Sequence, residues 1–215
     1  MEPLDDVEVR VLGALIEKEA TTPEYYPLSI NALVNACNQK SNRHPVVDYG
    51  EDDVADAILR LRAKKLAVTI IGNGRVNKYG QRISETLNLG RRELAVLNTL
   101  LLRGPQTLGE IKDRSERIFA FADLEEAERT MGRLAEWPET PLAKKLPRQP
   151  GQKEARYAHL LSGEPALEVG GEWGAENAGA AGPSRMAQLQ EEVRRLGTEL
   201  ADLKRRFEDL EAQLR

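Results

Sequence analysis

The chain has 215 residues, of which 40% are hydrophobic and 31% are charged, and its formal net charge at pH 7 is −4. This composition is typical of a soluble globular protein and excludes a largely disordered chain. The negative net charge argues against a protein whose whole surface coats nucleic acid, so any nucleic-acid-binding surface has to be local.

Targeting and metal-binding signals are missing from the sequence. The first residues, MEPLDDVEVR, contain no apolar run of the kind found in signal peptides, and no later stretch is apolar enough to span a membrane. We therefore expect a cytoplasmic protein without a membrane partner. The single cysteine, Cys37, and the two histidines, His44 and His159, cannot form a disulfide or a zinc site at any recognised spacing. We expect neither a metal nor a cofactor.

The first predicted elements are two helices. Apolar residues recur at helical spacing between residues 5 and 19, where Asp5 and Glu8 are placed to form a capping box. After a segment with two prolines, Ser29 begins a shorter helix that runs to Cys37. A polar segment follows that is too rich in Asn, Ser and Pro to continue a helix.

Residues 51 to 82 predict a third helix that leads directly into a β-hairpin. Val54, Ile58 and Leu61 lie on one face of the helix. The glycines of Gly72-Asn73-Gly74 then suit the turn of a hairpin, because they tolerate a positive φ. Three helices followed by a hairpin are the order of a winged helix-turn-helix domain, which we place at residues 1–85.

The same order recurs at residues 90–163, which we interpret as a second winged-helix domain. The pattern of the first helix returns at an offset of 85, so that Glu93 corresponds to Glu8. Thr107 and Glu110 predict a second capping box, and KEARY at 153–157 matches RVNKY at 75–79. An internal duplication therefore predicts a mainly α-helical chain with small β-hairpins, an α+β class.

The C-terminal part of the sequence predicts a linker and a coiled coil. Residues 164–183 are rich in Gly and Ala and are expected to form a flexible linker. Residues 184–215 carry nine apolar side chains at heptad positions a and d, which predict a homodimer because burying each one is worth roughly 1.5 to 3 kcal/mol. The alternative is a helix that folds back on its own domain. The nine residues are Met186, Leu189, Val193, Leu196, Leu200, Leu203, Phe207, Leu210 and Leu214.

Basic side chains that could contact the phosphates of duplex DNA lie mainly on the two predicted hairpins. Acidic clusters begin the third helix of each domain, and they oppose insertion of these helices into the major groove. The clusters are Glu51, Asp52, Asp53 and Asp56 in the first domain and Asp123, Glu125, Glu126 and Glu128 in the second. The alternative is that the basic groups only keep strand edges from pairing. The candidates are Lys40, Arg43, Arg75, Lys78, Arg82, Lys144, Lys145, Arg148, Lys153 and Arg156.

The polar segment at residues 35–45 offers a second functional hypothesis, a protein-interaction adaptor. Cys37 and His44 could be considered as a nucleophile and a base, but no orienting group or oxyanion hole is recognisable beside them, so we do not expect an enzyme. The residues that could contact a protein partner are Asn35, Asn38, Gln39, Ser41, Asn42 and His44.

Four motifs carry a family resemblance. They are EVRVLGALIEKEATTPEYYPLSINALVNACNQKSNRHPV at 8–46, GRVNKY at 74–79, LLLRGPQTLGEI at 100–111 and PGQKEARYAHLLSG at 150–163. These motifs resemble the YceH-like family of bacterial proteins, whose function is unassigned. The resemblance implies tandem winged helices and supplies no substrate and no catalytic residue.

Overall fold

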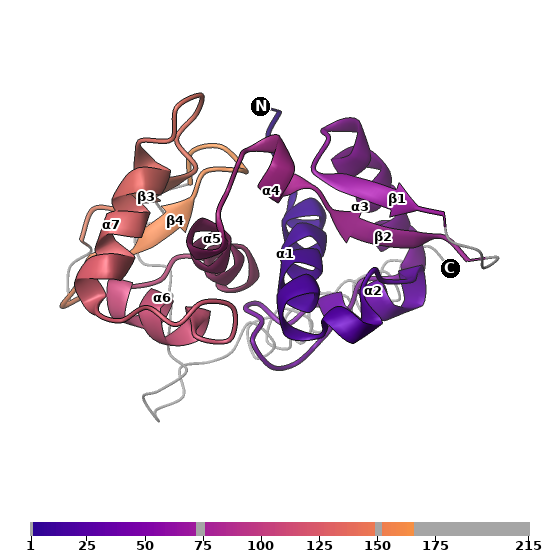
Figure 1. Ribbon diagram of the computed structural model, residues 1–215, viewed down its shortest axis with the longest axis horizontal. Helices are drawn as coiled ribbons and strands as arrows, with labels where there is room; N and C mark the ends of the chain where they lie inside the picture. Colours follow the sequence, from indigo (N-terminus) through magenta and orange to yellow (C-terminus); the bar gives the residue numbers. More distant parts are fainter. Residues whose placement is uncertain (1, 72–75, 149–151, 166–215) are drawn as a thin grey trace, which may run out of the picture. The chain divides into compact units, whose positions relative to one another are not determined.

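The computed structural model describes residues 2–71, 76–148 and 152–165. These residues form helices and two small antiparallel strand pairs, so the predicted α+β class is confirmed (Figure 1). The predicted linker from residue 166 onward and the predicted coiled-coil helix at 184–215 lie outside the described residues.

In the first half of the described chain, helices precede a β-hairpin, as predicted. The Asp5 carboxylate accepts the Glu8 N–H at 2.8 Å and the Glu8 carboxylate accepts the Asp5 N–H at 2.9 Å, which confirms the capping box. The elements are α1 at Asp6–Thr21, a 3-10 turn η1 at Pro23–Tyr25, α2 at Ile30–Cys37, α3 at Glu51–Ala63, β1 at Ala67–Ile70, β2 at Lys78–Gln81 and the short helix α4 at Ile83–Thr86.

The second half repeats the order of three helices followed by two paired strands, without counterparts of η1 and α4 in the described residues. The capping box of Thr107 and Glu110 is again present, with N–H to oxygen distances of 3.3 and 2.9 Å. The elements are α5 at Arg91–Arg103, α6 at Leu108–Ser115, α7 at Leu124–Ala135, β3 at Ala143–Lys145 and β4 at Tyr157–His159. We call β1 with β2 the first hairpin and β3 with β4 the second hairpin.

Each hairpin is held to its half by the same bridge. Leu28, just before α2, exchanges two backbone hydrogen bonds with Tyr79 of β2, at 3.0 and 2.7 Å. Gln106, just before α6, makes the same exchange with Tyr157 of β4, also at 3.0 and 2.7 Å. Tyr79 and Tyr157 are the two tyrosines that the matched hairpin motifs align, so they occupy equivalent places in the two halves.

The two halves also share an ion pair, which starts from a buried glutamate in the first turn of α1 and of α5. Glu8 of α1 pairs with Lys64, at the end of α3, at 2.8 Å. Glu93 of α5 pairs with Arg133, near the end of α7, at 2.9 Å. Glu8 and Glu93 are separated by the repeat offset, and each ties the first helix of its half to the third helix.

The two halves meet along α1 and α5, which lie side by side at the centre of the described chain (Figure 1). The Asn98 side-chain amide donates a hydrogen bond to the carbonyl of Gly13 at 2.7 Å, and these two residues are also 85 positions apart. Buried apolar residues of both halves belong to one continuous core. The halves are therefore joined through equivalent positions of their first helices.

Candidate nucleic-acid interface

The first hairpin is anchored at its base and exposed toward its turn. The Tyr26 hydroxyl accepts the Gln81 backbone N–H at 2.6 Å, next to the bridge from Leu28. Lys78 at the start of β2 is exposed, and it lies opposite Ile70 of β1. Arg82 is also exposed and forms a surface ion pair with Glu85 at 3.1 Å. Arg75 lies outside the described residues.

Four predicted residues of the second hairpin and its turn are exposed. Lys144 pairs with Glu164 at 2.7 Å, and the Lys145 ammonium lies 5.7 Å from the centre of the Tyr157 ring. Arg148 and Lys153 are exposed as well. Surface ion pairs of this kind are weak, so the pair with Glu164 does not prevent contact between these exposed side chains and a large ligand.

Arg156 has a structural role at the base of the second hairpin. Its guanidinium donates to the carbonyl of Pro105 and to the carboxylate of Glu110, each at 3.0 Å, and only 14% of its side chain is exposed. Because Glu110 also belongs to the capping box of α6, Arg156 connects the hairpin to that helix. It is a poor candidate for a phosphate contact.

Arg43, a predicted phosphate contact, is buried in the structure. Its side chain is fully buried, with 0% exposed, and Nη2 lies 2.6 Å from the Glu17 carboxylate. The guanidinium also donates to the carbonyls of Ala36, at 3.1 and 2.9 Å, and Asn42, at 3.1 Å. A phosphate therefore has no access to Arg43, whereas Lys40 in the same segment is exposed.

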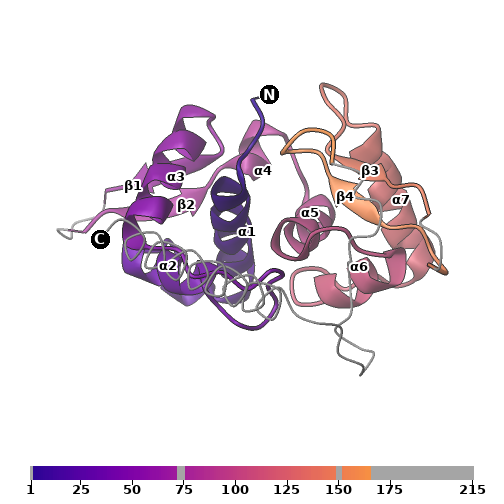
Figure 2. The same ribbon diagram turned by 180° about the vertical axis from the view of Figure 1, so that it is seen from behind.

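Residues 38–50, which we call the connecting segment, are fixed to both halves. Asn38 exchanges two hydrogen bonds with the backbone of Tyr49, each at 2.9 Å. The Asn42 side chain accepts from Arg103 of α5 at 2.6 Å, and the His44 backbone N–H donates to Leu102 at 2.8 Å. Figure 2 shows this segment passing from α2 below α1 toward α5 and α6. Much of the predicted partner loop is therefore engaged inside the protein.

The remaining side chains of that predicted loop differ in exposure. Asn35, Ser41 and His44 are exposed, whereas Gln39 is half-buried. The exposed groups form part of the protein surface.

The acids at the start of α3 and α7 contribute to helix capping. Asp53 accepts the Gly50 N–H at 2.8 Å, and Asp123 accepts the Glu126 N–H at 2.7 Å. Negative charge at a helix N-terminus is also stabilised by the helix dipole. Helix capping and the helix dipole therefore account for negative charge at the start of these two helices.

Cys37 lacks the environment of a nucleophile. Its side chain is buried, and burial raises the pKa of the thiol to about 12. The thiol therefore stays protonated at neutral pH, whereas the thiolate is the reactive form. Burial also keeps His159 neutral, because it lowers the pKa of the imidazole to about 4.

The sequence of this chain matches a family model described as "Protein of unknown function, DUF480" over residues 4–152. The chain belongs to the DUF480 family. A UPF0502 protein of Solibacter usitatus is 56% identical over 205 residues, which cover 95% of each chain. UPF0502 proteins of Pelobacter propionicus, 50% identical over 98% of this chain and 97% of the relative, and Geobacter sulfurreducens, 55% identical over 77% and 75%, are also similar.

The DUF480 match includes parts of both halves, from the residues before α1 to the turn region of the second hairpin. The family membership that the sequence motifs predicted is confirmed. None of the helices in residues 2–71, 76–148 and 152–165 could cross a membrane. Within those same residues no cluster of three His, Cys, Asp or Glu side chains could hold a metal ion.

Proposed function

We propose that this DUF480 protein is a non-enzymatic, cytoplasmic protein that binds duplex nucleic acid through its two hairpins, each acting as the wing of a winged helix. The supporting observation is the distribution of charge along the chain. No Asp or Glu occurs in residues 57–84 or in residues 140–153, although the whole chain is acidic. The basic residues in these stretches are Arg60, Arg62, Lys64, Lys65, Arg75, Lys78 and Arg82 in the first and Lys144, Lys145, Arg148 and Lys153 in the second.

The first stretch covers the C-terminal half of α3 and the first hairpin. Arg60 and Lys64 are paired with Asp5 and Glu8 at 2.9 and 2.8 Å. Arg62, Lys65 and Lys78 are exposed, and the described residues give these three side chains no hydrogen bond or ion pair. They are therefore available to phosphates without the loss of an internal contact.

The position of the acids favours one mode of binding over another. Glu51, Asp52 and Asp53 are exposed at the first turn of α3, the end that faces the bases in a helix-turn-helix. A carboxylate about 4 Å from a phosphate costs about 1 kcal/mol in water and about 4 kcal/mol at an effective dielectric constant of 20. We therefore propose contacts to the nucleic-acid backbone from the hairpins and the end of α3, with little reading of base sequence.

A dimer would double the number of these contacts. The heptad pattern of residues 184–215 predicts self-association, and two linked binding surfaces increase the overall affinity without any new contact. If about eight side chains of a dimer neutralise phosphates, the slope of log affinity against log salt is close to −7.

The test is a salt titration of binding to random-sequence duplex DNA. The double variant Lys65→Ala/Lys78→Ala removes two cations of the proposed surface, and Lys112→Ala/Arg129→Ala is a control of equal charge change. The two control cations lie beside acids, Lys112 at 3.9 Å from Asp113 and Arg129 at 3.2 Å from Glu125. We expect the first variant to weaken binding and to flatten the slope by roughly 0.9 for each lost phosphate contact, and the control to change neither. Salt-independent binding, or equal effects of both variants, contradicts the proposal.

A protein-interaction adaptor is the second candidate, and one observation favours it. Ile70 at the end of β1 is 40% exposed, and Ile71 and Val76, which lie in the chain between β1 and β2, are 83% and 61% exposed. Exposed apolar side chains of this size are unusual for a surface that only contacts phosphates. In a pulldown of crosslinked protein, a partner that survives nuclease treatment and is lost with Ile71→Ser supports the adaptor. Release of all bound material by nuclease supports nucleic-acid binding.

A further inference from the structure

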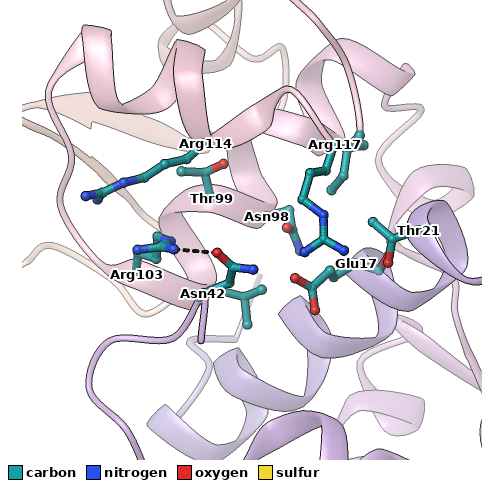
Figure 3. Close-up of a pocket in the computed structure, with 10 residues that line it drawn as sticks. Glu17, Thr21, Asn42, Asn98, Thr99, Arg103, Arg114 and Arg117 are labelled. Atoms are coloured by element: carbon teal, nitrogen blue, oxygen red, sulfur yellow. Dashed lines mark hydrogen bonds between the residues drawn. The ribbon is translucent and has the colours of Figure 1, made fainter. Parts of the chain in front are cut away.

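We propose that a pocket between the two halves binds a small anion through a single oxyanion group of phosphate size (Figure 3). The pocket lies between α1, the connecting segment, α5 and the end of α6, and both halves contribute to its wall. Its lining includes Glu17 and Asn42 from the first half and Asn98, Arg103 and Arg117 from the second half. The proposal is independent of nucleic-acid binding, because none of the lining residues lies on a hairpin.

The balance of charge in the pocket is positive. Glu17 is the one carboxylate among the lining residues, and its Oε2 is 2.6 Å from Nη2 of the buried Arg43. The protein thus neutralises the Glu17 charge internally. Arg117 adds a positive charge to which the described residues give no ion pair, and this charge favours an anion.

Two of these arginines are oriented by neighbouring side chains. Arg103 donates to Asn42 at 2.6 Å, the dashed contact in Figure 3. Arg114 donates to Gln106 and lies 3.6 Å from Glu110. Arg103 and Arg114 therefore form part of the pocket wall, and Arg117 is the arginine that meets the anion.

Arg117 and Asn42 provide the hydrogen-bond donors. Arg117 makes no hydrogen bond or ion pair with the described residues, and Figure 3 shows its guanidinium directed into the pocket toward Asn98 and Glu17. The side-chain oxygen of Asn42 accepts from Arg103, so its amide N–H groups remain for a ligand. The planar fork of an arginine matches two oxygens of a phosphate, and a neutral amide can donate to a third.

The size of the pocket restricts what enters it. Its volume is about 30 Å³, while a single water needs at least roughly 10 to 15 Å³. One oxyanion group fits into this space, and the remainder of any larger ligand has to extend into solvent. Arg117 is exposed, so the ligand reaches it directly from solution.

The probe is inorganic phosphate. It is titrated into the full chain at constant ionic strength, with sodium chloride as the control salt, and thermal unfolding is measured at each concentration. A site occupied only in the folded state raises the unfolding midpoint, by roughly 3 to 6 °C when free phosphate is ten times its dissociation constant. A phosphate monoester is titrated in parallel. Tighter binding of the ester points to a metabolite, whereas equal binding points to free phosphate.

Two variants and one control test whether phosphate binds in this pocket. Arg117→Ala removes the guanidinium group, and we expect the phosphate dissociation constant to rise roughly ten- to a hundredfold. Asn42→Gly removes the amide while tolerating the positive φ of 58° at this position, and we expect a weakening of several-fold. Arg129→Ala on the surface of α7 should leave phosphate binding unchanged. A midpoint that does not respond to phosphate, or an equal response in Arg117→Ala and Arg129→Ala, overturns the proposal.

Discussion

At the scale of single residues, Arg43 shows how a polar segment is fixed in the interior. A buried charge is costly unless it is paired and hydrogen-bonded. The Arg43 guanidinium bonds to Glu17 and to the carbonyls of Ala36 and Asn42. Through these contacts one side chain joins α1, the end of α2 and the connecting segment.

Replacement of Arg43 should therefore destabilise the protein strongly. Arg43→Ala leaves the Glu17 carboxylate, 8% exposed, without its main partner, and we expect a loss of about 3 to 5 kcal/mol in the free energy of unfolding. Urea denaturation measures the change. Lys40→Ala, at an exposed position of the same segment, is the control and should stay within about 0.5 kcal/mol of the parent. Similar values for the two variants contradict a structural role for Arg43.

The sequence could not predict the burial of Arg43. Its neighbours are Asn, Ser, His and Pro, which are typical of an exposed loop. Its partner Glu17 is 26 residues away, and no local pattern connects the two. For the same reason, nothing in the sequence indicated that Asn42, Arg103 and Arg117 line one pocket. Basic residues on exposed hairpin strands, such as Lys78 and Lys145, were easier to place because strand alternation and turn signals are local.

At the scale of elements, local signals were sufficient for most of the helices and both hairpins. Capping boxes at Asp5 and Thr107 fixed two helix starts, and apolar spacing fixed the buried face of α3. The short helix α4 carried no such signal, and the sequence did not predict it. The packing of α1 against α5 was also missed, because helical periodicity shows that a face is buried but not which helix covers it.

The contact of α1 with α5 depends on Gly13. A Cβ added there would meet Leu102 Cδ2 at 2.8 Å and Leu102 Cγ at 2.9 Å, and Leu102 is itself buried. Overpacking of this kind costs about 1 to 3 kcal/mol, more than the gain of about 1 kcal/mol when alanine replaces glycine in a helix. We therefore expect Gly13→Ala to lower the free energy of unfolding by about 1 kcal/mol.

A helical glycine with open space around it provides the matched control for Gly13. Nothing lies within 4 Å of a Cβ added at Gly132 in α7. Gly132→Ala should therefore raise the free energy of unfolding by about 0.5 to 1 kcal/mol through helix propensity alone. Urea denaturation of both variants tests the packing, and changes of the same sign in both would show that Gly13 is not required for it.

At the scale of the whole molecule, the two halves share a core, and their duplicated order places both hairpins on one folded unit. Separate domains at 1–85 and 90–163 remain a prediction from the repeat. Because Leu12 and Leu15 of α1 and Leu97 and Leu101 of α5 belong to the same cluster, separating the halves would expose apolar surface on each. The packing of the two halves against each other is thus part of the fold.

We expect the chain to assemble into a dimer through residues 184–215. Sedimentation of the full chain should give twice the monomer mass of 24.0 kDa, and a chain ending at Gly163 should sediment as a monomer. Leu196→Asp/Leu203→Asp places two charges in the apolar stripe at full length and should also give a monomer, whereas Thr198→Asp, at heptad position f, should remain dimeric. Monomers should bind duplex DNA more weakly, because the second linked contact is lost. A dimer that survives the double substitution would place the interface outside the heptads, and a monomeric full chain would mean that the stripe packs within its own chain.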